Sequence, residues 1–165
     1  MRRLILLRHA EAIHSSRYRD HERPLTEAGR KEASEAGARL AESSPPVDLA
    51  LVSDSQRTRE TWDHASAALN EAPEARFDRR IYEAERHDLM ELVRAQANSV
   101  KTLVLVGHNP ALAEFATHFV GRGESRALKR LGRGFPTGAI ALFEIEDVEW
   151  RKLRWGDGRL IDLWA

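Results

Sequence analysis

The sequence of 165 residues contains no cysteine. Disulfide bonds, zinc–thiolate sites and thiol nucleophiles are therefore excluded together. Neither sign of charge is in excess, because 26 Lys and Arg residues balance 26 Asp and Glu residues. Without a basic surplus, nothing in the composition points to nucleic acid as a partner. Any binding of anions must come from local clustering of basic side chains.

Long apolar runs are absent as well. Leu4 to Leu7 follows two arginines, as the start of a secretory signal would, but this run is far shorter than a signal sequence requires and it ends at Arg8. No other stretch approaches the length that crosses a membrane. We therefore expect a cytoplasmic protein without membrane partners. The length is sufficient for one domain with its own core, spanning residues 1–165.

Short apolar runs alternate with helical patterns, which is typical of an α/β fold with a mostly parallel sheet and antiparallel edge strands. Strands are expected at residues 4–7, 49–52, 79–82, 102–106, 139–145, 149–155 and 159–163. Helices are expected at residues 26–41, after Ser53-Asp54-Ser55, around Leu89 to Val93 and after Asn109-Pro110. The segment from Gly121 to Gly134 is rich in Arg, Lys and Gly, and we expect it to be a mobile loop.

Basic residues follow three of the predicted strands. Arg8 and His9 end the first, Arg57 lies in the helix after the second, and His108 follows the strand at 102–106. The carboxyl ends of neighbouring parallel strands share one edge of a sheet, so these residues are expected together. Guanidinium groups match phosphoryl oxygens. The two histidines can have separate roles. One can be a neutral nucleophile, provided that the ring nitrogen that does not attack donates to a fixed acceptor. The other can be a protonated ligand of the phosphate.

Four motifs occur in order: Leu6-Leu7-Arg8-His9-Ala10-Glu11, Arg23-Pro24-Leu25-Thr26-Glu27-Ala28-Gly29, Ser53-Asp54-Ser55-Gln56-Arg57-Thr58-Arg59-Glu60-Thr61 and Val106-Gly107-His108-Asn109-Pro110. With Phe135-Pro136-Thr137-Gly138-Ala139, they resemble the motifs of the histidine phosphatase superfamily, which has the phosphoglycerate mutase-like fold. Within it, the short chain is most similar to SixA-like phosphohistidine phosphatases. The resemblance implies a three-layer α/β/α sandwich and a hydrolase that forms a covalent phosphohistidine intermediate, with no metal and no cofactor.

At matching positions, the resemblance assigns His9 as the nucleophile, Arg8 and Arg57 as phosphate-binding residues and His108 as the second histidine. We add Asn109 as a substrate-binding candidate. Two residues depart from the family pattern. Ala10 stands where the family usually has glycine, and Asp54 where proline is common. Asp54 either places a carboxylate near the arginines or caps the following helix.

The larger mutase and phosphatase branches of the superfamily use a carboxylate as proton donor to the leaving oxygen. Glu83 is the first candidate for that role here, with Asp20 and Glu85 behind it. An absent acid favours a phosphohistidine substrate, because imidazole leaves more readily than an alkoxide. We therefore expect a phosphorylated substrate, with phosphohistidine on a protein as the first candidate. The alternatives are small phosphomonoesters and a binding module that holds phospho-ligands with little turnover.

Signatures of competing enzyme classes are missing. The sequence has no G-x-S-x-G nucleophile elbow, no P-loop and no H-E-x-x-H zinc motif. The remaining histidines are expected on the surface or in loops: His14, His21, His64, His87 and His118. A phosphatase with His9, Arg8, Arg57 and His108 at its centre is the interpretation that the sequence supports.

Overall fold

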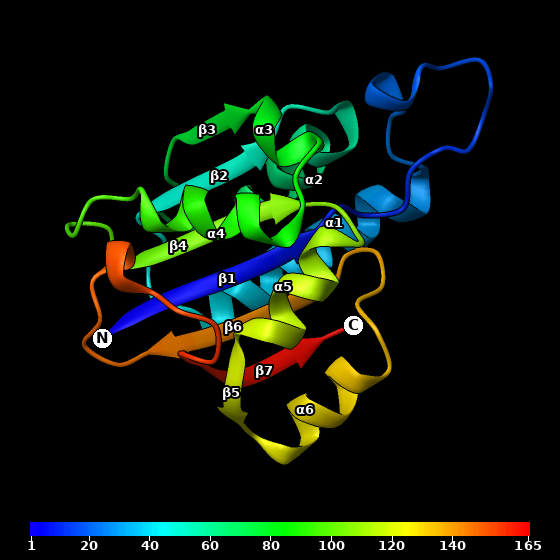
Figure 1. Cartoon of the computed structure of the whole chain (residues 1–165). Coiled ribbons are helices and arrows are strands. Elements are labelled where there is room, and N and C mark those ends of the chain that lie inside the picture. Colours follow the sequence, from blue (N-terminus) through cyan, green and yellow to red (C-terminus); the bar gives the residue numbers. More distant parts are fainter.

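The computed structural model describes residues 1–165, which form one seven-stranded sheet with helices on both faces (Figure 1). The elements in chain order are β1 (Arg2–Arg8), the 3-10 helix η1 (Asp20–Glu22), α1 (Glu27–Ser43), β2 (Leu49–Ser53), α2 (Gln56–Ser66), β3 (Ala75–Asp78), α3 (Arg79–Tyr82), α4 (Arg86–Arg94), β4 (Thr102–Gly107), α5 (Ala111–Phe119), β5 (Val120–Gly123), α6 (Ser125–Gly132), β6 (Ile140–Ile145), the 3-10 helix η2 (Trp150–Lys152) and β7 (Gly158–Trp164). The expected α/β/α sandwich is confirmed.

The strand order is β3-β2-β4-β1-β6-β7-β5. Strands β1, β2, β3 and β4 are mutually parallel, whereas β6 runs antiparallel to both β1 and β7. The expected antiparallel edge strands are wrong, because the antiparallel strand β6 lies inside the sheet and the edge strands β3 and β5 each pair in parallel. In the register, Arg8 of β1 pairs with Gly107 of β4, and Val52 of β2 pairs with Val106 of β4. The carboxyl ends of these three central strands are therefore level, and the segments that follow them meet at one edge of the sheet.

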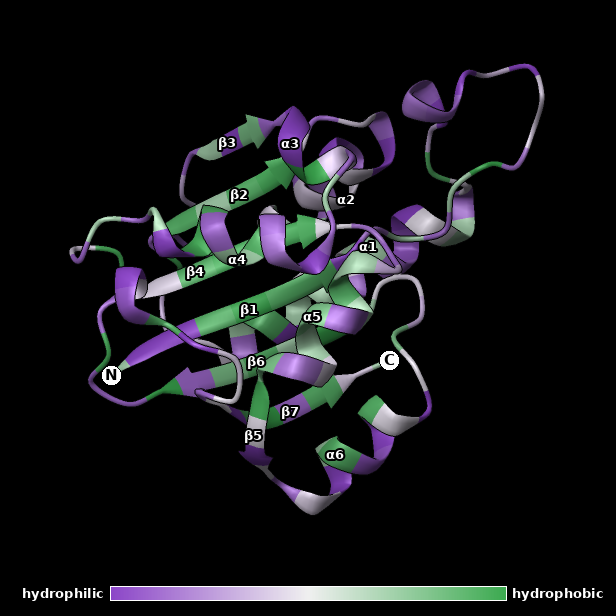
Figure 2. Ribbon diagram, viewed as in Figure 1, coloured by the Kyte–Doolittle hydropathy of each residue, from purple (hydrophilic) through white to green (hydrophobic).

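Strand β1 is buried on both faces, which explains its continuous apolar sequence. Because side chains alternate along a strand, Leu4 and Leu6 pack in the core under α4 and α5, while Ile5 and Leu7 pack in a second core under α1 and α2. Figure 2 shows apolar residues concentrated in β1, β2, β4 and β6. The buried central strands of the sheet thus lead directly to Arg8, His9 and His108.

Two predicted strands are wrong. Residues 79–82 form the helix α3, because the side chain of Asp78 accepts a hydrogen bond from the backbone nitrogen of Arg80 and so starts a helix. The strand β3 lies just before it. Residues 149–155 contain only η2, whose Trp150 is fully buried and donates from Nε1 to the carbonyl oxygen of Val100 at 2.7 Å. Trp150 is therefore buried because it packs in the core from a short helix, and not because it belongs to a strand of the sheet.

The segment from Gly121 to Gly134 is ordered into β5 and α6, so the expectation of a mobile loop is wrong. Its glycine is required for close packing, because a Cβ atom on Gly121 would lie 1.9 Å from the carbonyl oxygen of Gly156. Helix α6 is held by buried Ala127 and by Arg130, whose Nη1 donates to the carbonyl oxygen of Leu163 at 2.7 Å. None of the helices combines the length and the apolar character needed to traverse a membrane.

Candidate active site

His9 follows β1 directly and is 8% exposed. Its Nδ1 lies 2.7 Å from the carbonyl oxygen of Ala10. A carbonyl oxygen can only accept, so Nδ1 carries the proton and the lone pair of the neutral ring lies on Nε2. This is the fixed acceptor that a histidine nucleophile needs. The expected role of His9 is therefore matched by a defined tautomer.

The pKa of His9 is lowered to about 4. Burial is the main cause, since it penalises the charged imidazolium, and the positive charges of Arg57, Arg8 and Arg23 add to the effect. The hydrogen bond to Ala10 opposes them. At neutral pH the ring is thus uncharged, and Nε2 is free to attack an electrophile.

Arg57 lies in the first turn of α2, which begins because the side chain of Ser55 accepts from the backbone nitrogen of Thr58. The Arg57 side chain is almost completely buried. Its Nη1 donates to the carbonyl oxygen of Asp20 at 2.7 Å, and its Nη2 donates to Oδ2 of Asp20 at 3.2 Å. Its Nε is buried and has no hydrogen-bond partner. Asp20 thus holds one side of the guanidinium and leaves the Nε–H available.

Arg8 is arranged in the same way. Its Nη1 donates to the carbonyl oxygen of Phe135 at 3.1 Å, and its Nε is buried without a partner. The same carbonyl oxygen accepts from Nδ2 of Asn109 at 2.7 Å, while Oδ1 of Asn109 accepts from the backbone nitrogen of Ala113 at 3.3 Å. The Asn109 amide is therefore engaged with the protein on both sides. It supports Arg8 through Phe135, whereas the sequence suggested substrate contact.

The backbone of Gly138 packs against the backbone of Arg8 and His9. Its nitrogen is within hydrogen-bond distance of the carbonyl oxygens of Arg8, at 3.2 Å, and His9, at 3.0 Å. Its φ is +73°, and a Cβ atom there would lie 2.8 Å from Oε1 of Glu32. Only glycine fits both conditions without strain. This explains why the Phe135 to Ala139 segment belongs with the other motifs.

His108 faces His9, with the two ring centroids 5.4 Å apart. Its Nε2 lies 2.7 Å from Oγ of Ser53, and its Nδ1 is buried without a partner. Burial, reinforced by the charge of Arg57, lowers its pKa to about 3. The sequence suggested a protonated phosphate ligand. In the unliganded protein His108 is instead neutral at physiological pH, because it is buried beside like charge.

Thr61 lies in the third sequence motif and connects the backbone that follows His9 to Arg57. Its Oγ1 accepts from the backbone nitrogen of Ala10 at 3.0 Å and donates to the carbonyl oxygen of Arg57 at 2.7 Å. Ala10 is fully buried, and it packs with Leu25 and Ala33. The departure from glycine at Ala10 is therefore accommodated by a small apolar cluster.

Asp20 is held by three donors. Besides Arg57, it accepts from the hydroxyl of Tyr82 at 2.5 Å and from Nε of Arg23 at 3.1 Å. The Tyr82 hydrogen bond and the two guanidinium groups lower the pKa of Asp20 to about 2. Asp20 is therefore ionised at neutral pH and has no proton to donate. Its role in the structure is that of a counter-ion to Arg57.

The structure does not bring Glu83 into contact with the four central residues. Its carboxylate is 69% exposed, and its ion-pair partner is Arg79 at 3.9 Å. Glu85 lies at the start of α4, where its backbone nitrogen donates to Asp88. The neighbouring side chain, Tyr82, approaches His108 instead, with ring centroids 5.5 Å apart. The only sequence signal for Tyr82 was its position next to Glu83.

The sequence predicts that Asp54 either places its carboxylate near the arginines or caps α2, and the structure shows neither. Its Oδ1 lies 2.8 Å from Nε2 of His21, and this pair keeps the carboxylate away from the arginines. Ser55, not Asp54, caps α2. The departure from proline at Asp54 thus adds a contact with the segment before α1 and does not add a second carboxylate to the Arg57–Asp20 ion pair.

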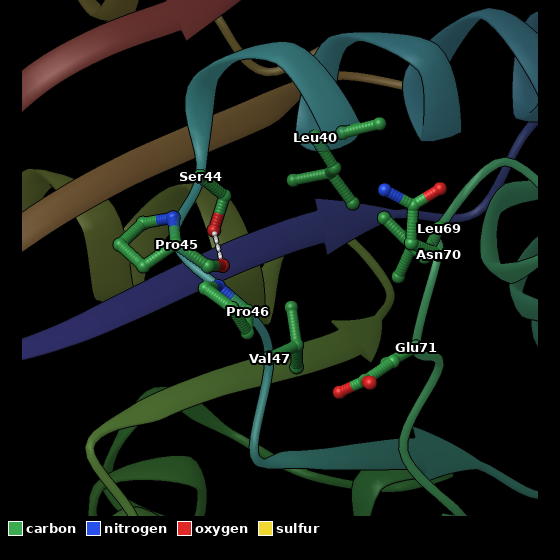
Figure 3. A pocket seen from close by; sticks show the side chains of 9 residues that line it. Leu40, Ser44, Pro45, Pro46, Val47, Leu69, Asn70 and Glu71 are labelled. Atoms are coloured by element: carbon green, nitrogen blue, oxygen red, sulfur yellow. Dashed lines mark hydrogen bonds between the residues drawn. The ribbon is translucent and has the colours of Figure 1, made fainter.

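A separate apolar cavity lies at the opposite end of β2 from Ser53 (Figure 3). Its volume is about 410 Å³. It is lined by the end of α1 and the segment after α2, namely Leu40, Ala41, Ser44, Pro45, Pro46, Val47, Leu69, Asn70 and Glu71. The lining contains no cation, and the one hydroxyl, that of Ser44, donates to the carbonyl oxygen of Pro45, so we assign the cavity no part in the chemistry.

Comparison with known proteins shows which family has this arrangement of residues. The model of the histidine phosphatase superfamily (branch 1) matches residues 4–98. An uncharacterized protein of Mycobacterium tuberculosis is 32% identical over 141 residues, which cover 84% of this chain and 87% of that protein. The chain belongs to the histidine phosphatase superfamily. An uncharacterized protein of Mycobacterium leprae is also 32% identical, over 143 residues.

Solved structures show which members of the superfamily this histidine phosphatase is similar to. A protein of Agrobacterium tumefaciens named as phosphohistidine phosphatase SixA is 31% identical, with a TM-score of 0.82 over 99% of this chain and 97% of that one. A protein of the same designation from Nakamurella multipartitia is 28% identical, with a TM-score of 0.85 over 99% and 95%. The phosphatase is therefore SixA-like.

The tautomer and charge of His9 can be measured by NMR titration of its ring nitrogens. We expect the ring to stay neutral, with the proton on Nδ1, from pH 8 down to about pH 5, because burial and the arginines hold its pKa near 4. The signals are assigned by their loss in His9→Gln. A midpoint of protonation at pH 6 or above would contradict the assignment of a neutral buried nucleophile.

Thr61 offers a matched pair of variants. Thr61→Val keeps the shape but leaves the buried nitrogen of Ala10 without a partner, so we expect a loss of about 1–3 kcal/mol in the free energy of unfolding. Thr61→Ser keeps the hydroxyl and should lose less. Urea denaturation of both variants checks this. Equal stability of the two variants would show that the Ala10 contact is unimportant.

Proposed function

We propose that this histidine phosphatase hydrolyses phosphohistidine on a protein through a phosphoryl group carried by His9. One observation supports the proposal above all others. Three buried side-chain nitrogens without a partner surround the nucleophile: Nε of Arg8, Nε of Arg57 and Nδ1 of His108. Buried polar groups are nearly always satisfied, so three such atoms in one place indicate a missing polar ligand.

The charge of these groups identifies the ligand class. Arg8 and Arg57 are permanent cations, and each is tethered through Nη1 to a backbone carbonyl oxygen, so that Nε remains. A phosphoryl group supplies the oxygens and the negative charge that such donors lack. Asp20 offsets part of the charge of Arg57 but contacts it through the terminal nitrogens. A dianionic phosphoryl group is the ligand that fits.

In the first step, Nε2 of His9 attacks phosphorus. The Nε2–P bond forms while the P–N bond of the substrate breaks, and its electron pair goes to the nitrogen of the departing imidazole. The reacting form of the substrate carries a proton on its other ring nitrogen, so the ring passes from a cation to neutral imidazole as it leaves. Arg8, Arg57 and His108 donate to the phosphoryl oxygens, and His108 does so through Nδ1 when Ser53 donates to its Nε2.

In the second step, water attacks the phosphorus of phospho-His9 from the side that the leaving group has vacated. The Nε2–P bond breaks, its electron pair returns to Nε2, and inorganic phosphate is released with the proton of water passing to phosphate or solvent. The hydrogen bond from Nδ1 to Ala10 is unchanged in both steps. His9 therefore returns to the neutral tautomer with which it began.

The lack of a proton donor supports phosphohistidine over a phosphomonoester. Of the predicted donors, Asp20 is bound to Arg57 and ionised, and the exposed Glu83 pairs with Arg79 and does not contact the site. An alkoxide leaving group needs a proton in the transition state, whereas imidazole does not. A binding module without turnover would have no use for a neutral His9 with a free Nε2. The geometry thus favours an enzyme acting on a P–N bond.

The phosphoryl intermediate can be trapped by mixing the enzyme with ³²P-labelled phosphohistidine and quenching in alkaline denaturant, where phosphohistidine survives. We expect label on the wild type and none on His9→Ala. In Arg57→Lys the rate should fall about 10³-fold, because lysine lacks the buried Nε–H that Arg57 holds free for the transferred group. The exposed His87 provides the control, and His87→Ala should label normally. Label or turnover that survives His9→Ala contradicts the nucleophile assignment.

The substrate class is tested by comparing kcat/KM for a phosphohistidine-bearing protein with that for small sugar phosphates. We expect the phosphohistidine protein to be preferred, since the site supplies no acid for an alkoxide. A preference for sugar phosphates would be incompatible with the proposed substrate. Tight binding of inorganic phosphate with no turnover of either substrate would instead identify a binding module.

A further inference from the structure

Four aromatic rings lie in sequence from the surface to the nucleophile. The ring centroids are 4.8 Å apart for His21 and Tyr82, 5.5 Å for Tyr82 and His108, and 5.4 Å for His108 and His9. His9 is buried, whereas His108, Tyr82 and His21 are all partly exposed. Tyr82 therefore lies between His108 and the partly exposed His21.

The ring of Tyr82 is held in place from both ends. Its hydroxyl donates to Oδ2 of Asp20, which is itself bound by Arg57 and Arg23. At the backbone, α3 is anchored by Ile81, which is 2% exposed and packs beside Gly107, where a Cβ atom would lie 3.3 Å from its Cγ2. The ring is thus positioned before any ligand binds, with no ordering of this side chain required.

The position of the leaving group follows from the direction of attack. His9 attacks phosphorus from the buried side, and in-line displacement places the departing group opposite to it. His9 is buried, whereas Tyr82 and His21 are partly exposed, so we place the departing group on the side of these two rings. The two rings meet at 90°, which is the edge-to-face geometry that aromatic pairs prefer.

We propose that Tyr82 is a specificity-determining residue whose ring packs against the imidazole of the substrate phosphohistidine. This inference rests on the proposed function. A planar imidazole gains an aromatic contact there that the carbon chain of phosphoserine or a sugar phosphate does not gain. Contacts of this kind change rates or affinities by about two- to tenfold. Tyr82 thereby selects the leaving group, while the arginines bind the phosphoryl group common to all substrates.

The test compares two P–N substrates that differ in the ring. Nδ1- or Nε2-phosphohistidine carries the imidazole, and phosphoramidate has the same type of scissile bond with ammonia as its leaving group. In Tyr82→Leu, we expect kcat/KM for phosphohistidine to fall about two- to tenfold relative to that for phosphoramidate. Tyr82→Phe keeps the ring and should keep the wild-type ratio. Phe77→Leu, at an exposed aromatic on β3, is the control for the same kind of truncation.

Each outcome supports or overturns the inference. An equal loss on both substrates in Tyr82→Leu would mean that Tyr82 acts only through Asp20 and Arg57. A changed ratio in Tyr82→Phe would assign the effect to the hydroxyl, and an unchanged ratio in Tyr82→Leu would remove Tyr82 from specificity. Failure of the proposed function is separate, because it shows in the wild type, as a preference for sugar phosphates. Thermal unfolding verifies that the variants fold, and Tyr82→His provides a smaller ring should Tyr82→Leu not do so.

Discussion

The hydrogen bond from Nδ1 of His9 to the carbonyl oxygen of Ala10 is the interaction on which the chemistry of this histidine phosphatase depends. It selects the tautomer and fixes the ring plane, so that Nε2 is available in one direction. The Ala10 peptide is itself held by Thr61, whose hydroxyl also bonds to the backbone of Arg57. His9 and Arg57 are therefore held by one shared side chain, although they follow different strands.

Burial of positive charge explains the electrostatics of the site. Arg8 and Arg57 lie beside two buried histidines, an arrangement that is unfavourable for folding without an anion. The same burial keeps His9 and His108 neutral and leaves three nitrogens without partners. One physical cause thus keeps both histidines uncharged and leaves buried donors that an anion would satisfy. Carbonyl oxygens of Asp20 and Phe135 offset part of the cost by holding the guanidinium groups.

Elements that depend on local pattern were predicted well, and elements that depend on long-range contacts were not. Strand β1 and helix α1 follow from an apolar run and from the cap at Thr26, whose side chain accepts from Gly29. Residues 79–82 and 149–155 were expected to be strands because apolar and aromatic residues occur there. Asp78 starts a helix in the first segment, and burial of Trp150 determines the second. Segment 121–134 has a loop composition, but Gly121 and Gly123 are closely packed against neighbouring backbone.

The sequence alone determined the order of strands and helices around the site and the identity of His9, Arg8, Arg57 and His108 as the residues that meet there, because parallel strands end at one edge. The tertiary structure alone decided the protonation of those residues and the neighbours that surround them. Tyr82 reaches Asp20 across 62 positions of the chain, while adjacent Glu83 turns to solvent. Tautomers and pKa values depend on burial and on contacts between distant segments, and these exist only once the chain has folded.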